Sequence, residues 1–408
     1  MRPSDIVILS TVMIDAMGIG LILPVMPALI EEIQGGSLAQ AAIWGGILST
    51  VFAIMQFLFG PVLGALSDAI GRRPVILVSL FVLGLDYLIM ATAGSMWILL
   101  IGRIIGGITS ATHATASAYM ADISKPEDKA ANFGLVAAAF GAGFVLGPLI
   151  GGLLAEFGTR APFYAAAGLS VLNGCIGLLV LRETVTDRIR RPFSWANANP
   201  FGALRYIGRL PGLMPLLIVM LFYQLAINTY PAIWAFFTRA RFGWSPQMIG
   251  FSLALFGIAI AAIQGGLIRV VLKYWGERRT VILGHVFEIA AFTAIVFVAS
   301  GTGLLILTPL AALGAIASPA LQGLMSQRVG DDEQGALQGV IMSISSLAMI
   351  LSPLLMTNIF AAFTREGAAL QFPGAPFAVA TGLILVGLLI FLRHERQDTT
   401  HQRHGGRF

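Results

Sequence analysis

The sequence has few charged residues and a single cysteine. Charged residues make up 11% of its 408 residues, against about 25% in soluble domains. Cys175 is the only cysteine, which excludes a disulfide framework and a cysteine metal cluster, and we expect it to be a small packed residue. No G-x-x-x-x-G-K-[ST], H-E-x-x-H or G-x-S-x-G motif is present. ATP is therefore not expected as an energy source, and an intramembrane enzyme is disfavoured.

Long apolar stretches take the place of charge. Apolar residues make up 57% of the chain, and its mean hydropathy is +0.85. About twenty apolar residues cross a bilayer as one helix, and such segments follow one another almost from end to end. We expect an all-α polytopic membrane protein whose first span is retained and stops at Pro27. The twelve transmembrane helices are predicted at 6–29, 42–65, 74–93, 97–120, 131–155, 161–181, 213–237, 247–272, 280–299, 303–325, 336–361 and 375–392.

The basic residues set the expected orientation. With twelve spans both termini lie on one side, and placing that side in the cytoplasm puts 20 of the 25 Lys and Arg residues inside. Four fall outside, at Arg160, Arg239, Arg241 and Arg365, and Arg103 lies within the membrane. Cytoplasmic loops carry such an excess of positive charge. This bias explains the net charge of +5 without nucleic acid as a partner.

Two six-helix halves are expected. Residues 182–212 form the longest hydrophilic stretch, which we interpret as a cytoplasmic linker between a bundle at 1–181 and a bundle at 213–392, with a cytoplasmic tail at 393–408. Gly71-Arg-Arg-Pro-Val-Ile-Leu77, after the second helix, is echoed by Gly276-Glu-Arg-Arg-Thr-Val-Ile-Leu283 after the eighth. A duplicated six-helix unit requires a repeat at this position, and many transporters build alternating access from such repeats.

The first half has three charged residues at bilayer depth. Such groups are costly there and are functional candidates by default. Asp15 in the first helix and Asp86 in the third are candidates for proton coupling or substrate binding, with a hydrogen-bonded structural role as the alternative. Arg103 in the fourth helix stays protonated and needs a partner or a watery cavity. Either acid could supply an ion pair with it, which is permanent in one interpretation and opens with substrate or proton in the other.

In the second half, Glu288 is the only acid within a predicted span. His285 precedes it by three residues and shares its helix face, so the two could form a proton relay or a simple solvated pair. His113 in the fourth helix either takes part in substrate or proton chemistry or hydrogen-bonds a neighbouring helix. Gln224 and Asn228 could line a polar cavity or serve as packing contacts. These five residues join Asp15, Asp86 and Arg103 as candidates for proton coupling or substrate binding.

The fifth helix is rich in glycine. From Gly134 through Gly152 the glycines recur at small-xxx-small spacing, which predicts close approach of a neighbouring helix, and Pro148 should bend the helix. A charged hairpin at 64–74 precedes the third helix. Asp122, at the cytoplasmic end of the fourth helix, could accept a hydrogen bond from Arg72 or Arg73 and clamp an inner gate there. The echo at 276–283 lacks the preceding aspartate, so the two gates should not be equivalent.

Three motifs carry a resemblance to a known family. Gly64-x-x-x-Asp68-x-x-Gly71-Arg72-Arg73 resembles the loop signature of the major facilitator superfamily. Leu100-x-x-Arg103-x-x-x-Gly107 is similar to its intramembrane arginine motif. A run in helix five resembles the antiporter motif of its drug exporters, with Gly141, Gly143, Gly147, Gly151 and Gly152 around Pro148.

The resemblance narrows to the tetracycline/proton antiporters and covers nearly the whole chain. It is carried by Asp15-Ala-Met-Gly-Ile-Gly-Leu-Ile-Leu-Pro24, Asp86-Tyr-Leu-Ile-Met-Ala-Thr-Ala93, Gly107-Ile-Thr-Ser-Ala-Thr112 and Arg241-Phe-Gly-Trp244. The chain also departs from that family. The antiporters' helix-eight histidine is replaced by Ile260, their helix-nine aspartate aligns with Glu288, and His113 stands where relatives have a small residue.

The resemblance implies proton-coupled efflux of an amphipathic drug, most simply tetracycline, by alternating access in the bacterial inner membrane. It implies no cofactor and no resident metal, although the drug could travel as a divalent-metal chelate, and we expect a functional monomer. The open alternative is a major facilitator porter for a different drug or a small metabolite, because a fold does not fix a function.

Overall fold

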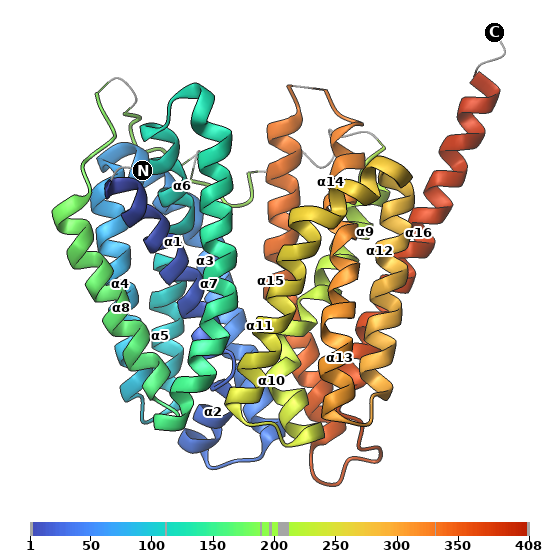
Figure 1. Ribbon diagram of the computed structural model, residues 1–408, viewed down its shortest axis with the longest axis horizontal. Helices are drawn as coiled ribbons and strands as arrows, with labels where there is room; N and C mark the ends of the chain where they lie inside the picture. The colour runs from blue at the N-terminus through green and yellow to red at the C-terminus, as the bar shows by residue number, and fades with distance from the viewer. Residues whose placement is uncertain are drawn as a thin grey trace.

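The computed structural model describes residues 3–110, 112–187, 190–195, 198–202, 212–330 and 332–405, without the side chains of 113, 130 and 397–405. Parts of the predicted linker and the end of the predicted tail lie outside these residues. The described chain is almost entirely helical and forms two bundles side by side, blue to green and yellow to red in Figure 1. Both termini lie at the same end of the bundles (Figure 1), which we call the linker end.

Six spans form the first half. They comprise α1 (Pro3–Ile22), α3 (Leu38–Ile70), α4 (Arg72–Thr92), α5 and α6 (Met96–Thr109 and Thr112–Ile123), α7 (Lys129–Leu154) and α8 (Ala161–Val180). The 3₁₀ turns η1 (Pro126–Asp128) and η2 (Ala155–Phe157) flank α7. A short helix, α2 (Met26–Gln34), lies between α1 and α3 at the end of the molecule opposite to the linker (Figure 1). We call this the α2 end.

Six further spans form the second half. They comprise α9 and α10 (Met214–Ile227 and Thr229–Phe242), α11 (Pro246–Ala262), α12 (Ile268–Phe297), α13 and α14 (Gly301–Ala311 and Ala317–Ser326), α15 (Gln334–Thr364) and α16 (Ala375–Gly405). A π-helical segment, η4 (Ile263–Leu267), joins α11 to α12, and a 3₁₀ segment, η5 (Ala312–Ile316), joins α13 to α14.

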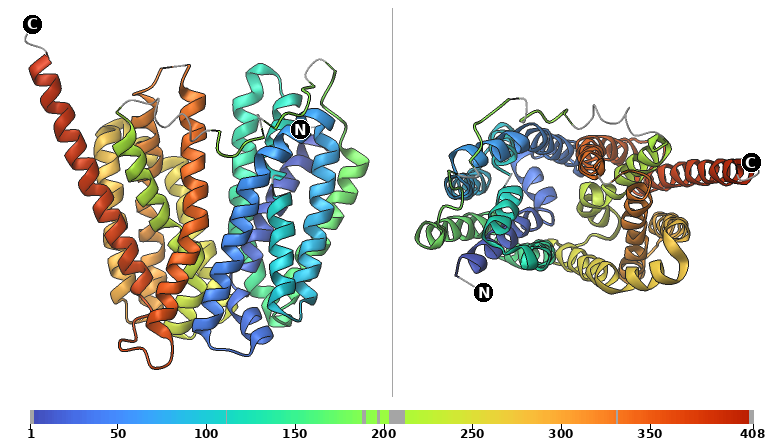
Figure 2. Two further views of the ribbon diagram at one scale, coloured as in Figure 1. Left: turned by 180° about the vertical axis from the view of Figure 1, so that it is seen from behind. Right: turned by 90° about the horizontal axis from the view of Figure 1, so that it is seen from above.

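Eleven described helical stretches are long and apolar enough to cross a membrane. One of them, Pro246–Phe297, reverses at Gly276, where φ is 68° and ψ is 170°, so it crosses twice. The predicted twelve-helix, all-α membrane fold is confirmed. The second half is seen beside the first from behind and from above in Figure 2.

Several predicted boundaries were wrong. The 64–74 hairpin is mostly helix, because α3 continues to Ile70 and the reversal is confined to Gly71, whose φ of 117° suits glycine. The first span ends at Ile22, and Pro27 lies in the first turn of α2, where a proline's missing N–H costs nothing. The predicted tail begins as a continuation of α16 to Gly405.

Cys175 was predicted to be packed and is exposed. It shares the outward face of α8 with Leu172, Ile176 and Leu179, which are also exposed. Because α8 lies at the edge of the first half (Figure 1), this face is directed away from the bundle. The apolar sequence around Cys175 therefore reflects the lipid environment and not burial in protein.

Serine caps define the helix starts at the α2 end. The Ser37 hydroxyl accepts a hydrogen bond from the amide of Gln40, and the Ser37 amide donates one to Oε1 of Gln40, which forms a capping box at the start of α3. Ser95, Ser245 and Ser300 cap α5, α11 and α13 in the same way, through the amide three residues on. These polar residues end each apolar run and fix where the next span begins.

The two halves touch near the α2 end and separate toward the linker end. Gly46 of α3 lies against Thr357 of α15, whereas a Cβ on Gly64 would meet nothing within 4 Å. Gly152 of α7 lies against the start of α11, whereas Gly134 also faces open space. Each pair is separated by eighteen residues, or about five helical turns, and shares one helix face. The same faces are therefore covered at one end and uncovered at the other.

Candidate functional site

An ion pair is buried in the first half, as predicted for Arg103. Its Nη2 lies 2.7 Å from Oδ2 of Asp86 and 2.7 Å from the sulfur of Met90. The ring of Phe52, on α3, covers the guanidinium at 5.0 Å from its centroid. Asp86 is fully buried and Arg103 nearly so. Of the two acids considered for Arg103, the structure selects Asp86.

The face of α5 is shaped around Asp86. A Cβ on Gly102 or Gly106 would collide with the Asp86 carboxylate. Among the described residues, Oδ1 of Asp86 and Nε of Arg103 have no hydrogen-bond partner. Because buried polar atoms are normally paired, this ion pair retains one free acceptor and one free donor, which could bind a ligand.

Asp15 is buried one helical turn before Gly18 of α1. The hydroxyl of Tyr87 occupies the space that a side chain on Gly18 would need. Tyr87 directly follows Asp86 in α4, and its ring lies against α1 one turn from Asp15. Tyr87 is therefore close to both acids. Asp15, Asp86 and Arg103 thus lie on α1, α4 and α5 of one bundle, in agreement with the predicted grouping of the first, third and fourth spans.

Glu288 and His285 are buried on α12. His285 is fully enclosed and Glu288 is 1% exposed, so the interpretation as a solvated pair is wrong. Nδ1 of His285 lies 2.8 Å from the carbonyl oxygen of Val281, so it donates there in the neutral ring. Within the described structure, Nε2 of His285 and Oε2 of Glu288 have no partner. The second half thus contains a buried acid and a buried base with unused polar atoms.

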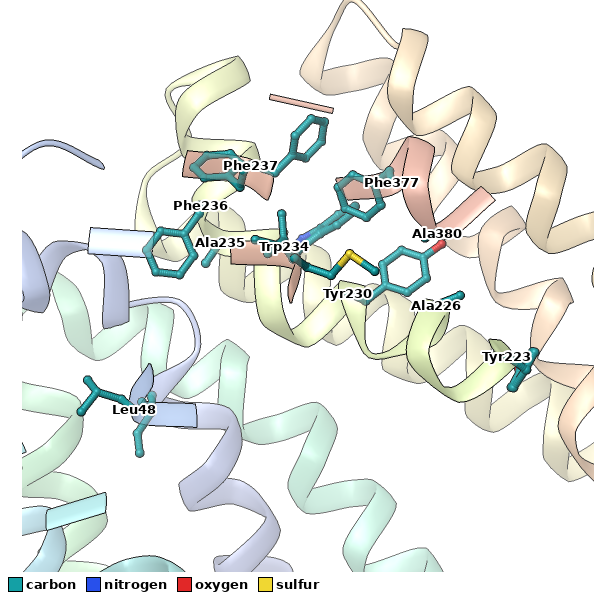
Figure 3. Close-up of a cluster of buried hydrophobic side chains, with 14 of the residues drawn as sticks. Leu48, Tyr223, Ala226, Tyr230, Trp234, Ala235, Phe236, Phe237, Phe377 and Ala380 are labelled. Carbon is teal, nitrogen blue, oxygen red and sulfur yellow. The ribbon is translucent and has the colours of Figure 1, made fainter. Parts of the chain in front are cut away.

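Aromatic rings surround this part of the second half. The ring of Tyr230 lies 4.9 Å from that of Phe256 and 5.0 Å from that of Phe292, centroid to centroid. Phe377 and Trp234 belong to the same cluster (Figure 3). Tyr223 contacts the ring of His285 at 5.8 Å. Such a cluster excludes water on the side of Glu288 that is remote from the linker end.

The predicted amides lie between α9 and its neighbours. Gln224 donates to Ser345 of α15 at 2.7 Å, and Asn228 donates to the carbonyl of Gln224 at 2.7 Å. Both are half-buried. Asn228 stands at the junction of α9 and α10, so it also satisfies the helix end. His113 belongs to α6, but its side chain lies outside the described part of the chain.

The loop signature forms a polar network at the linker end. Arg72 pairs with Asp68 at 2.5 Å and with Asp122 at 3.4 Å, so the predicted contact with Asp122 is present. Arg73 instead donates to the carbonyl of Leu178. Gly64 and Gly71 complete this segment: Gly64 accepts from Ser67, and Gly71 makes the turn.

Glu183, which was not predicted from the sequence, anchors this network. Its carboxylate accepts the backbone amides of Arg72 and Arg73, at 2.9 and 3.2 Å. These are unpaired donors of the first turn of α4, and a negative charge is favourable at a helix N-terminus. The sequence feature that could have identified Glu183 is its position as an acid just after the sixth predicted span.

The second half has a related anchor, also missed. Glu395 of α16 pairs with Arg278, which follows the turn at Gly276, at 3.0 Å, and with Arg328 at 2.8 Å. Arg278, in the echo of the loop signature, therefore pairs with an acid of the last span. In the first half, the amides of Arg72 and Arg73 likewise bind Glu183, which follows the sixth span. The two networks are related but not equivalent, as expected from the missing aspartate.

Ion pairs at the α2 end were not predicted either. Glu31 of α2 pairs with Arg239 of α10 at 2.6 Å and so joins the two halves. The next residue, Glu32, pairs with Arg160 of the first half at 3.0 Å. From the sequence, Arg239 and Arg160 were predicted only to be two of the four basic residues on the outer side.

The glycines of α7 have two partners. Gly143, Gly147 and Gly151 contact the backbone of α1, one helical turn apart. On another side, Gly152 meets the start of α11, and the carbonyl of Pro148 fills the space beside Gly250 of α11. Close packing is thus confirmed for these residues. It is wrong for Gly134 and Gly141, which face open space because the halves have already separated at their level.

No group of three or more His, Cys, Asp or Glu residues that could hold a metal ion occurs in the described parts of the chain. Ionisable side chains with unpaired buried atoms lie deep in the spans at Asp86–Arg103 in the first half and at His285–Glu288 in the second. Buried ionisable groups facing the interior of a membrane bundle mark substrate or ion pathways.

Comparison with known proteins identifies the family. The chain matches the family described as Major Facilitator Superfamily over residues 8–353 and 216–407. It is 42% identical to "Tetracycline resistance protein, class C" of Escherichia coli, over 94% of this chain and 95% of the relative. It is 37% identical to the class B protein of Escherichia coli, over 88% and 89%. A solved nucleoside transporter superposes with a TM-score of 0.79 at 13% identity, over 96% of this chain and 99% of that chain.

Proposed function

The chain belongs to the Major Facilitator Superfamily, and we propose that it exports tetracycline by proton-coupled alternating access. The relatives named as tetracycline resistance proteins span nearly the same length as this chain. The observation that carries the proposal is a buried polar site inside each half, combined with halves that are in contact toward the α2 end and separate toward the linker end. An exporter needs a midplane site that opens to alternate sides.

We propose that the linker end faces the cytoplasm of a bacterial inner membrane. Most of the Lys and Arg residues belong to that end, and cytoplasmic segments carry such an excess. In this orientation, the separation of the halves at the linker end fits a state that receives drug from inside. The protein acts as a transporter, and we propose that a single copy is sufficient.

We propose that Asp86 and Arg103 bind the drug through the unused Oδ1 and Nε atoms. Asp15, buried near Tyr87, and Glu288 exchange protons, and His285 offers Nε2 to the proton of Glu288. Gln224 and Asn228 supply neutral polar contacts, and His113 remains a candidate. A drug bound as a divalent-metal chelate would bring its metal as part of the substrate. The proposal requires no resident metal.

We propose that the Arg72 network with Asp68 and Asp122 forms the inner gate. All the partners named for Arg72 belong to the first half, which fits an open inner side. Closing the inner side would bring the α3–α4 turn toward the second half. The packing of α7 against both α1 and α11 then lies near the axis about which the halves rock.

The proposal is tested by expression in a drug-sensitive bacterium. Cells with the wild-type chain should resist tetracyclines, and Asp15→Asn and Asp86→Asn should each lower resistance at equal protein levels. Asp187→Asn is the matched control, because Asp187 is 99% exposed outside the spans. Absence of resistance to any tetracycline or unrelated drug would exclude the export function. Resistance unaffected by both variants would exclude the assigned sites.

A further inference from the structure

Phe52 is the aromatic partner of the buried arginine, and it was not among the candidate residues. Phe52 lies on α3, whereas Arg103 lies on α5, so the ring reaches the guanidinium from a neighbouring helix. A cation over an aromatic face is attracted by the ring's negative quadrupole, more strongly when both are removed from water. Arg103 is almost fully buried, so this contact acts where it is strongest.

Arg103 depends on this ring because its hydrogen bonding is incomplete. Only Nη2 is engaged by Asp86 and by the sulfur of Met90, and Nε has no partner among the described residues. A buried guanidinium normally satisfies several of its five donors. The ring face of Phe52 supplies part of the stabilisation that hydrogen bonds do not.

The spacing Arg103-x-x-x-Gly107 explains how the ring comes so close. Residues four apart share a helix face. A Cβ on Gly107 would lie 2.6 Å from the carbonyl oxygen of Phe52 and 2.6 Å from Cβ of Met55. Gly107 therefore lets the backbone of α3 approach α5 at the turn next to Arg103, which brings the ring over the guanidinium. Gly107 has no positive φ, so space is the reason for glycine here.

The same helix contacts the other half of the molecule. Thr50, two residues before Phe52, donates to the carbonyl of Ile350 in α15 at 3.0 Å, and Gly46 lies against Thr357. One stretch of α3 thus contacts both the buried ion pair and the surface on which the halves meet. A movement of α3 relative to α5 would change the position of the ring over Arg103.

We propose that Phe52 is a positioning residue that holds Arg103 on Asp86 and ties this pair to the contact between the halves. It acts on the drug through Arg103 and does not itself need to touch the drug. The proposal rests on the proposed drug-binding role of Asp86 and Arg103. The role of Gly107 is to leave the space that lets α3 approach and place the ring over Arg103.

The test compares aromatic and non-aromatic residues at position 52. In membrane vesicles, Phe52→Leu should raise KM for tetracycline roughly 2- to 30-fold, the range of a cation–π contact. Phe52→Tyr and Phe52→Trp should stay close to wild type, because they keep the ring face. Phe57→Leu, on the same helix but in contact with Phe201, is the matched control and should leave KM unchanged. Rates are compared per amount of inserted protein, and Phe52→Met replaces Phe52→Leu if the latter does not insert.

Three results would overturn the inference. One is an unchanged KM in Phe52→Leu, or in Phe52→Met where it replaces that variant, while Asp86→Asn abolishes transport; this result refutes the role of Phe52 alone. Another is a KM in Phe52→Tyr and Phe52→Trp as high as in Phe52→Leu, which indicates a purely steric role. The last is normal transport by Asp86→Asn, which removes the proposed drug site and with it the reason for positioning Arg103.

Discussion

The ion pair between Glu31 and Arg239 should act as a latch that keeps the α2 end closed. It joins α2 of the first half to α10 of the second. If the halves rock as proposed, this contact must break in each cycle. Neutralising either residue should therefore shift the population toward the state that is open at the α2 end.

The size of the shift follows from the exposure of the pair. The Glu31 side chain is 23% exposed and that of Arg239 is 35% exposed. Such surface pairs contribute at most about 1 kcal/mol, which changes the ratio of two states by about fivefold. The same pair should weaken as ionic strength rises, because salt screens exposed charges.

Cysteine accessibility measures this population. Cys175 is the only cysteine, so Cys175→Ser gives a cysteine-free background, and Thr357→Cys places a reporter at a buried position against Gly46. A membrane-impermeant maleimide added from outside should label the reporter about fivefold faster with Glu31→Gln or Arg239→Gln. The charge exchange Glu31→Arg with Arg239→Glu should restore slow labelling.

Glu32 provides the matched control. Its partner Arg160 belongs to the same half, so Glu32→Gln should leave the labelling rate unchanged. Equal labelling rates in Glu31→Gln and wild type would refute the latch. Fast labelling in the charge-exchanged protein would show that the residues matter for a reason other than their attraction.

Two further predictions concern the linker end. Asp122→Asn removes one charged partner of Arg72 and should lower the transport rate and alter labelling of cysteines on the cytoplasmic side; unchanged values for both would exclude a gating role. Glu395→Gln weakens the contacts with Arg278 and Arg328 and should lower the free energy of unfolding by about 2 kcal/mol, as for hydrogen bonds between charged groups. The loss should appear as a lower temperature of thermal unfolding in detergent. An unchanged unfolding temperature would contradict the anchoring role of Glu395.

The sequence was sufficient to predict the fold because the membrane imposes a strong pattern. Apolar runs of fixed length, separated by basic turns, identify spans one at a time. The same rule explains the errors. It locates where hydrophobicity stops and not where a helix ends, so α3 and α16 run further than predicted. It also cannot distinguish a lipid-facing residue from a packed one, as Cys175 shows.

The candidate site was predictable where a residue is anomalous in its own span. Asp86, Arg103 and Glu288 are charges in apolar helices and are recognisable without a structure. Glu183 and Glu31 lie near span ends, where charge is ordinary, and their partners are more than a hundred residues away in sequence. Phe52 is one of 26 phenylalanines, and only the approach of α3 to Gly107 distinguishes it. Such contacts depend on how helices are placed, which no local pattern contains.

Drug accumulation in everted membrane vesicles tests the central claim most directly. In this orientation the cytoplasmic face is outside, so an acid-inside proton gradient should drive labelled tetracycline into the vesicles. A protonophore should release the drug, and Glu288→Gln or Asp86→Asn should abolish accumulation. Accumulation that persists after the gradient collapses, or no accumulation of tetracycline by the wild-type protein, would contradict proton-coupled export.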